Sequence, residues 1–183
     1  MMLVLLITLA LFATPRAAAG QQSSRPDTLA SMSRKPGEGI ETRHLRMTLA
    51  AEPAAAAPGR LVTLIADVEP RPGMHVYSPE QKDVVAVALV LDRDPRIRPG
   101  ARRLPPSEAY FFAPLNETQR VYSRRFRIEQ DVRVLDTPAI RRLAADGGSL
   151  TIAGVLRYQA CDEAVCYLPQ NVPVTWTIAL DRP

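Results

Sequence analysis

The chain contains very few of the residues that bind metals or stack on nucleic-acid bases. Of its 183 residues only two are cysteine and two are histidine, and aromatic residues make up 5%. Structural zinc needs about four cysteine or histidine ligands together, and His44 and His75 are distant in sequence from the cysteines. The basic residues, almost all arginine, do not alternate with aromatics as a nucleic-acid platform requires. With no Gly-rich phosphate loop either, we expect no metal, no cofactor and no nucleic-acid partner.

Long apolar runs are also missing, except for one at the N-terminus. The run from Met2 to Ala13 is too short to span a membrane and is followed by the small residues Ala17 to Gly20. This pattern predicts a signal peptide over residues 1–20, with a retained N-terminal anchor as the alternative. No later segment is apolar for long enough to cross a bilayer. We therefore expect a periplasmic or secreted protein without stable membrane insertion.

Composition divides the remaining chain into a tail and one domain. Residues 21–42 are rich in Ser, Pro, Gly and charge, which predicts a flexible tail. Residues 43–183 are numerous enough to bury a core without help from disulfides. Within them, the basic stretch from Arg93 to Arg103 is interrupted by Pro and Gly and is interpreted as a solvated loop.

Apolar residues alternate with polar ones along most of the domain, and this period of two is typical of half-buried strands. The alternating residues are Val62, Leu64, Ala66 and Val68; Val85, Val87, Leu89 and Leu91; Tyr122, Phe126 and Ile128; Leu150, Ile152, Leu156 and Tyr158; and Val172, Val174, Trp176, Ile178 and Leu180. Turns such as Arg71-Pro72-Gly73 separate the runs. One short helix is expected after Thr137 as N-cap, ending before Gly147. The fold class predicted is all-β, an immunoglobulin-like antiparallel β-sandwich with one short connecting helix.

Cys161 and Cys166 lie between two predicted strands that form a hairpin, 150–160 and 171–180. In an exported chain such a pair is usually oxidised. Most such disulfides are structural staples, but a bond that closes so short a loop removes little entropy from the unfolded chain. A disulfide at a hairpin tip is also well placed for attack by an incoming thiolate. Asp162 and Glu163 lie inside the loop, where their charge opposes thiolate formation. A cysteine nucleophile with a histidine base is disfavoured because both sulfurs are expected to be oxidised.

Three segments carry a resemblance to a known family. They are Tyr158-Gln159-Ala160-Cys161-Asp162-Glu163-Ala164-Val165-Cys166-Tyr167-Leu168-Pro169, then Pro72-Gly73-Met74-His75-Val76-Tyr77, and, more weakly, Glu108-Ala109-Tyr110-Phe111-Phe112 followed by Val121-Tyr122. Together they resemble the N-terminal periplasmic domain of the membrane disulfide reductase DsbD, from about Arg43 onward. Only the cysteine segment is distinctive by itself.

The resemblance implies roles for individual residues. Cys166 would form a mixed disulfide with a thioredoxin-like partner, and Cys161 would resolve it. His75 and Tyr77 would line the site, while Tyr110 or Phe111 would shield the sulfurs until a partner displaces the loop. The family's cap begins with two acidic residues, of which only Glu108 has a clear counterpart here. Each assignment has a simpler alternative. Tyr77 could be an ordinary core residue, and the aromatic residues from Tyr110 to Phe112 could form an apolar patch under a loop.

Two functions remain open from the sequence. The first is a periplasmic thiol–disulfide interchange module that passes electrons to or from thioredoxin-fold proteins through Cys161 and Cys166. Because the chain ends at Pro183, a separate membrane reductase or a soluble thioredoxin-like donor is then expected to supply the electrons. The alternative is a non-catalytic immunoglobulin-like module that binds another envelope protein and uses the disulfide as a staple.

Overall fold

Alternating apolar side chains form the faces of two sheets in the computed structural model, which describes residues 39–182. In β4 (Leu61–Pro70), for example, all four alternating residues from Val62 to Val68 are buried. The other strands are β1 (Ile40–Glu41), β2 (Leu45–Glu52), β3 (Ala55–Ala56), β5 (His75–Tyr77), β6 (Ala88–Leu91), β7 (Ile97–Arg103), β8 (Glu108–Phe112), β9 (Glu117–Tyr122), β10 (Phe126–Val134), β11 (Ser149–Tyr158), β12 (Ala160–Cys161) and β13 (Gln170–Leu180). A 3-10 turn covers Ala113–Leu115, and α1 covers Pro138–Ala145.

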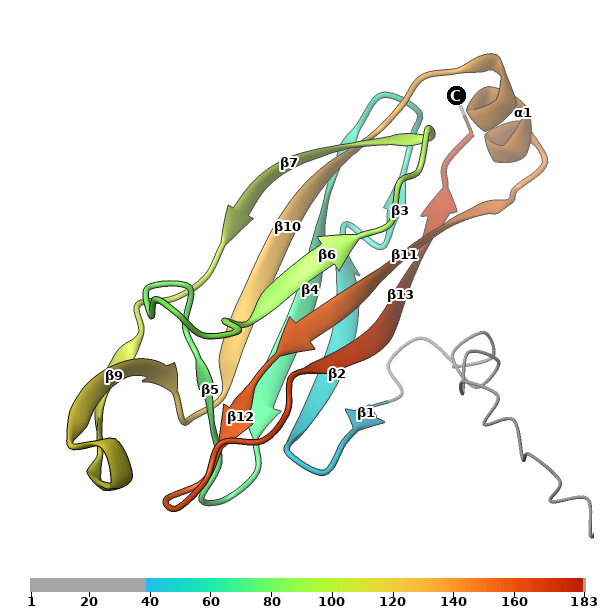
Figure 1. Cartoon of the computed structure of the whole chain (residues 1–183). Helices are drawn as coiled ribbons and strands as arrows, with labels where there is room; N and C mark the ends of the chain where they lie inside the picture. Colours follow the sequence, from blue (N-terminus) through green and yellow to red (C-terminus); the bar gives the residue numbers. More distant parts are fainter. Residues whose placement is uncertain (1–38, 183) are drawn as a thin grey trace, which may run out of the picture.

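The strands form three sheets. Their orders are β1-β2-β4-β10-β7, β3-β13-β11-β6 and β12-β5-β9-β8. The first two sheets lie face to face and enclose the main core, with the Trp176 Nε1–H group of β13 donating to the Ile65 carbonyl of β4 at 3.0 Å (Figure 1). All strand pairs are antiparallel except the short pairing of β3 with β13. The predicted all-β sandwich with one short helix is confirmed.

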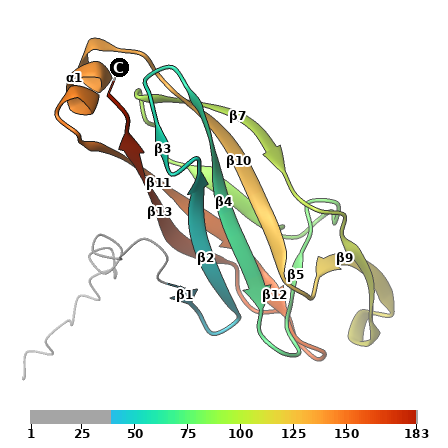
Figure 2. The ribbon, with the colours of Figure 1, turned by 180° about the vertical axis from the view of Figure 1, so that it is seen from behind.

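The third sheet is small and lies at one end of the sandwich, whereas α1 lies at the other end (Figures 1 and 2). One of its two inner strands, β5, follows a turn in which the Met74 amide donates to the Arg71 carbonyl at 2.9 Å. Pro72 and Gly73 occupy the two middle positions, and Gly73 has a φ of 77°, a conformation that glycine adopts without strain. The sequence Arg71-Pro72-Gly73 thus directs the chain into the strand that carries His75 and Tyr77.

The predicted helix is present with the predicted N-cap. The Thr137 hydroxyl accepts a hydrogen bond from the Ile140 amide, and Ile140 and Ala144 are buried. Gly147, with a φ of 68°, follows the helix and donates its amide to the Ala144 carbonyl. The helix connects β10 to β11 and is remote from the cysteines.

Three predictions need correction. The stretch from Arg93 to Arg103 is solvated as expected, but from Ile97 it forms β7, an edge strand paired with β10, and its Pro and Gly sit where the register shifts. The predicted run from Tyr122 to Ile128 is divided between β9 and β10, in different sheets. The tail was predicted to reach Thr42, yet Ile40 and Glu41 form β1 and Ile40 is buried.

The predicted signal peptide, and the predicted tail before residue 39, lie outside the described residues. Within residues 39–182 no helix is long and apolar enough to cross a membrane.

Candidate functional site

The two cysteines form a disulfide and differ, as residues, in their exposure to solvent. Cys161 ends β12 and is 0% exposed, whereas Cys166 is exposed. Their Cα atoms are 4.0 Å apart, and the chain folds back between them as an isolated antiparallel bridge. Of the two cysteines, Cys166 is therefore the one that offers surface to solvent.

Asp162 organises the loop between the cysteines. Its Oδ1 accepts hydrogen bonds from the backbone amides of Ala164 and Val165, both at 2.8 Å, and its Oδ2 accepts one from the Tyr167 hydroxyl at 2.6 Å. These bonds, led by that from Tyr167, lower the pKa of Asp162 to about 2. The loop therefore holds a fixed negative charge at neutral pH, and its shape depends on hydrogen bonds as well as on the disulfide.

Tyr77 contacts the exposed sulfur. Its hydroxyl lies 3.2 Å from Cys166 Sγ and is the donor, because a disulfide sulfur carries no hydrogen. Burial raises the pKa of Tyr77, so the hydroxyl keeps its proton at neutral pH. The same hydroxyl could donate to a thiolate at Cys166, and such a bond stabilises the charged form.

His75 lies directly across from the buried sulfur. In the pairing of β5 with β12, His75 is the partner of Cys161, and Val76 is the partner of Ala160. The His75 ring is 4.3 Å from that of Tyr110, and His75 is 2% exposed. Its Nε2 has no hydrogen-bond partner among the described residues. Burial lowers the pKa of His75, against an opposing influence of the charge on Asp162.

The predicted cap residues separate in the structure. Tyr110, on β8, packs on the small cluster formed by Tyr77, Val121 and Cys161. Phe111, the next residue, is 59% exposed, as alternation along a strand requires. Glu108 begins the strand and accepts hydrogen bonds from the hydroxyl and backbone amide of Ser123. Of the three, it is Tyr110 that packs against the cluster containing Cys161.

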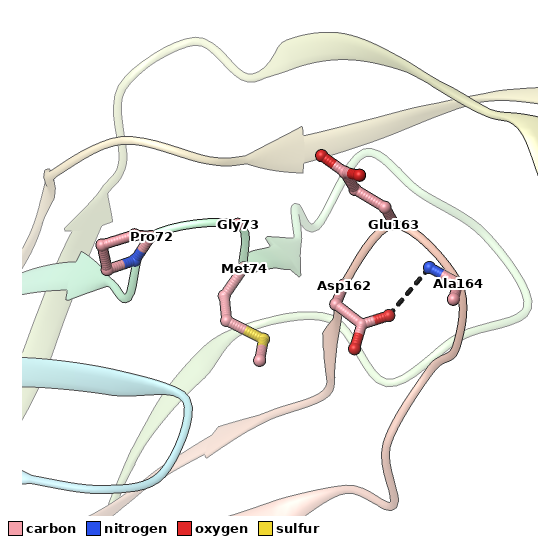
Figure 3. A pocket seen from close by; sticks show the side chains of 6 residues that line it. All are labelled: Pro72, Gly73, Met74, Asp162, Glu163 and Ala164. Atoms are coloured by element: carbon pink, nitrogen blue, oxygen red, sulfur yellow. Dashed lines mark hydrogen bonds between the residues drawn. The ribbon is translucent and has the colours of Figure 1, made fainter.

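A shallow pocket of about 270 Å³ opens beside the disulfide loop (Figure 3). One wall is the turn before β5, with Pro72, Gly73 and Met74, and the other is the loop residues from Asp162 to Ala164. The Met74 side chain reaches from the turn toward Asp162 across the pocket (Figure 3).

Sequence reasoning missed two features of this site. Asp162 was interpreted only as a charge. Aspartate side chains, however, commonly accept hydrogen bonds from the backbone amides two and three residues later and so shape a loop. His44 was not connected with the site, yet it is buried and its ring is 4.7 Å from that of Tyr167. No local pattern in the sequence indicates that contact, since 122 residues lie between His44 and Tyr167 in the chain.

The described residues offer no group of three or more His, Cys, Asp or Glu side chains that could hold a metal ion. The chemistry available at this site is that of the disulfide, with a tyrosine hydroxyl at one sulfur and an imidazole opposite the other.

Comparisons with known proteins agree with this description. The search of curated proteins returned no significant match. Among solved structures, the N-terminal periplasmic domain of ScsB from Proteus mirabilis has a TM-score of 0.53 and 14% identity, over 80% of this chain and 52% of that chain. The reduced N-terminal domain of Neisseria meningitidis DsbD has a TM-score of 0.39 and 16% identity, over 71% of this chain and 89% of that chain. This chain thus spans about half the length of the ScsB domain. At this level of identity, the similarity shows a shared fold.

The family model described as "Thiol:disulfide interchange protein DsbD, N-terminal" matches residues 46–177. The match includes both cysteines, β5 and β8, which carry the site. On this match, the chain belongs to the family of DsbD N-terminal domains.

Proposed function

We propose that this chain is a thiol–disulfide interchange module that passes electrons to or from thioredoxin-fold proteins through Cys161 and Cys166. The observation that carries the proposal is the unequal exposure of the two cysteine residues: Cys161 is 0% exposed and Cys166 is exposed. A staple has no need of such asymmetry, whereas an exchange reaction needs one sulfur within reach and one protected from side reactions.

The reaction begins at Cys166. A partner thiolate attacks its Sγ, the bond between the two cysteines breaks, and the electron pair of that bond leaves on Cys161. A second thiolate of the partner then attacks the partner's own sulfur in the mixed disulfide and releases Cys166 as a thiolate. Two electrons have moved to this chain, and the partner has gained a disulfide. Run backward, the same steps reduce the partner, and relative reduction potentials set the direction.

Three neighbours support this chemistry. Tyr77 stabilises a Cys166 thiolate through its hydroxyl, 3.2 Å from the sulfur. Tyr110 keeps water and small oxidants away from Cys161, because it packs on the cluster that contains that sulfur. The open pocket beside the loop leaves room for the partner chain that brings its thiolate to Cys166. By kinship with periplasmic domains of this family, we also place the chain and its partners in the periplasm.

Capture of a mixed disulfide tests the proposal. Cys161→Ser removes the resolving sulfur and leaves the exposed one, so it should accumulate an adduct with a thioredoxin-fold partner through Cys166. Cys166→Ser is the matched control, because it leaves one cysteine that is buried, and it should accumulate none. Equal capture by both variants would contradict the proposal, as would no capture by Cys161→Ser when its thiol is shown to be free by alkylation.

A further inference from the structure

Opening the disulfide at Cys166 leaves the other sulfur in a place that disfavours charge. Cys161 is 0% exposed and packs with Tyr77 and Val121, with Tyr110 against the same cluster. A thiolate formed there loses the hydration that stabilises it in water. Fast exchange therefore requires a group inside this site that supplies a proton to Cys161 when the bond opens and removes it when the bond closes.

The strand pairing places one such group opposite Cys161. His75 and Cys161 are direct partners in antiparallel strands, and directly opposite side chains have Cβ atoms about 5 Å apart on one face of the sheet. Their neighbours Val76 and Ala160, which point to the other face, belong to the main core. His75, Tyr77 and Cys161 therefore share the face that Tyr110 covers. The His75 ring is 6.4 Å from that of Tyr77 and 6.3 Å from that of Phe112.

The other titratable groups around His75 are unsuited to the task. Tyr77 on the same strand is a phenol whose pKa is raised by burial, and the Tyr110 ring on β8 packs against the His75 ring. Asp162, in the disulfide loop, has its pKa lowered to about 2 by hydrogen bonds to its carboxylate oxygens. The pKa of Tyr77 is raised by its burial and also by the charge of Glu117 on β9. Imidazole is the side chain that exchanges protons near neutral pH, and His75 Nε2 has no partner among residues 39–182.

We propose that His75 is the proton acceptor and donor for Cys161. In the oxidation direction, Cys166 is first joined to the partner in a mixed disulfide, and Cys161 is still a thiol. The Cys161 thiol then gives its proton to the His75 imidazole. The Cys161 sulfur then attacks Cys166 Sγ, the intramolecular disulfide forms, and the partner leaves as a thiolate. When the bond opens, the proton returns from imidazolium to the departing Cys161 sulfur. This inference rests on the proposed function, since it concerns the half of the reaction that follows attack at Cys166.

A two-phase oxidation separates the two sulfurs. The reduced chain is mixed with one equivalent of dithiobis(nitrobenzoate), whose thiolate product absorbs visible light. Attack by Cys166 releases the first nitrothiobenzoate and leaves the second bound as a mixed disulfide. Attack by Cys161 then releases the second and closes the protein disulfide. The first phase reports Cys166, and the second reports Cys161 and its proton acceptor.

His75→Phe keeps an aromatic ring in the cluster and removes both ring nitrogens. We expect the second phase to slow by about a hundredfold at neutral pH, the lower end of what a general base contributes, while the first phase is unchanged. The second phase of the wild-type chain should fall as pH drops through the imidazole range. In His75→Phe the rate of the second phase should instead rise only at the higher pH at which a buried thiol ionises. Phe111→Leu is the control, because Phe111 lies in the same small sheet, on β8, but its side chain is 59% exposed, and this variant should keep the wild-type pH profile.

An unchanged second phase in folded His75→Phe would overturn the inference. The inference would also be overturned if the rate of the wild-type second phase did not change with pH in the range where imidazole titrates. Should His75→Phe fail to fold, nuclear magnetic resonance titration of the His75 ring in the wild-type chain gives the answer. The ring's titration midpoint should differ between the oxidised and reduced states, and equal midpoints would contradict the inference. Failure of Cys161→Ser to capture a thioredoxin-fold partner would remove the proposed function while leaving these proton measurements valid.

Discussion

Reduction of the disulfide should weaken the domain only slightly and leave its fold intact. Cys161 and Cys166 are separated by 5 positions, so the bond closes a very short loop. For a loop of about six residues, the chain-entropy relation gives a loss of roughly 7 cal/mol/K in the unfolded chain, or about 2 kcal/mol of stability near room temperature. The main core between the two large sheets contains neither cysteine. The loop also keeps the hydrogen bonds that the Ala164 and Val165 amides donate to Asp162, and the Tyr167 amide donates to the Ala160 carbonyl at 2.8 Å.

The assay is urea unfolding of the wild-type chain, oxidised and reduced, followed by tryptophan fluorescence and circular dichroism. We expect the free energy of unfolding to fall by about 2 kcal/mol, or the melting temperature by roughly 4–8 °C for a domain of this size. The double variant Cys161→Ala/Cys166→Ala is the control for the reductant, whose addition should leave its stability unchanged. Unfolding on reduction, or a loss above about 5 kcal/mol, would refute the reasoning and support a structural staple.

Three further predictions concern the neighbours of the disulfide. Tyr77→Phe removes the hydroxyl that contacts Cys166 Sγ, and hydrogen bonds to charged groups contribute about 1.5–3 kcal/mol. The pKa of the Cys166 thiol, measured by the pH dependence of alkylation, should therefore rise by about one unit or more. An unchanged pKa would show that the hydroxyl does not stabilise the thiolate. Tyr110→Ala should make the buried sulfur of the reduced chain reactive toward iodoacetamide, whereas Phe111→Ala, the control on the exposed face, should not; equal protection in both would exclude Tyr110 as the cap. The folded-state pKa of Asp162 lies below its ordinary value of 3.8, at about 2, so its contribution to stability is present above pH 3.8 and is lost as the pH falls toward 2. Asp162→Asn should lack this part of the pH dependence when urea unfolding is measured at a series of acid pH values. A pH dependence of stability parallel to that of the wild-type chain would contradict the assignment.

The sandwich was predictable because its signals are local. Alternation along β4, β11 and β13 and the cap at Thr137 each require only a few neighbouring residues, and the structure has them where the pattern placed them. The error at β7 has a physical cause. Proline and glycine usually interrupt strands, but an edge strand with a register shift tolerates both.

The site was predictable in its residues and not in its arrangement. The spacing of the cysteines indicates a hairpin tip, yet it does not indicate which sulfur is buried. That difference arises because the chain crosses from β11 to the third sheet at Ala160, so Cys161 joins the buried cluster of Tyr77 and Val121 while Cys166 does not. Likewise, alternation in β8 could have shown that only one of Tyr110 and Phe111 faces the sulfurs, but not which one. The contact of His44 with Tyr167 depends on tertiary packing alone.

The central claim is that a partner's thiol can open the bond between Cys161 and Cys166 at equilibrium. Its most direct test is the reduction potential of the intact oxidised chain, measured against a thioredoxin of known potential by alkylation and mass analysis of the mixture. The account predicts a potential above about −300 mV, within the range in which thioredoxin-fold proteins exchange electrons. A potential below about −300 mV, with the chain still oxidised in excess reduced thioredoxin, would contradict it and identify the bond as structural.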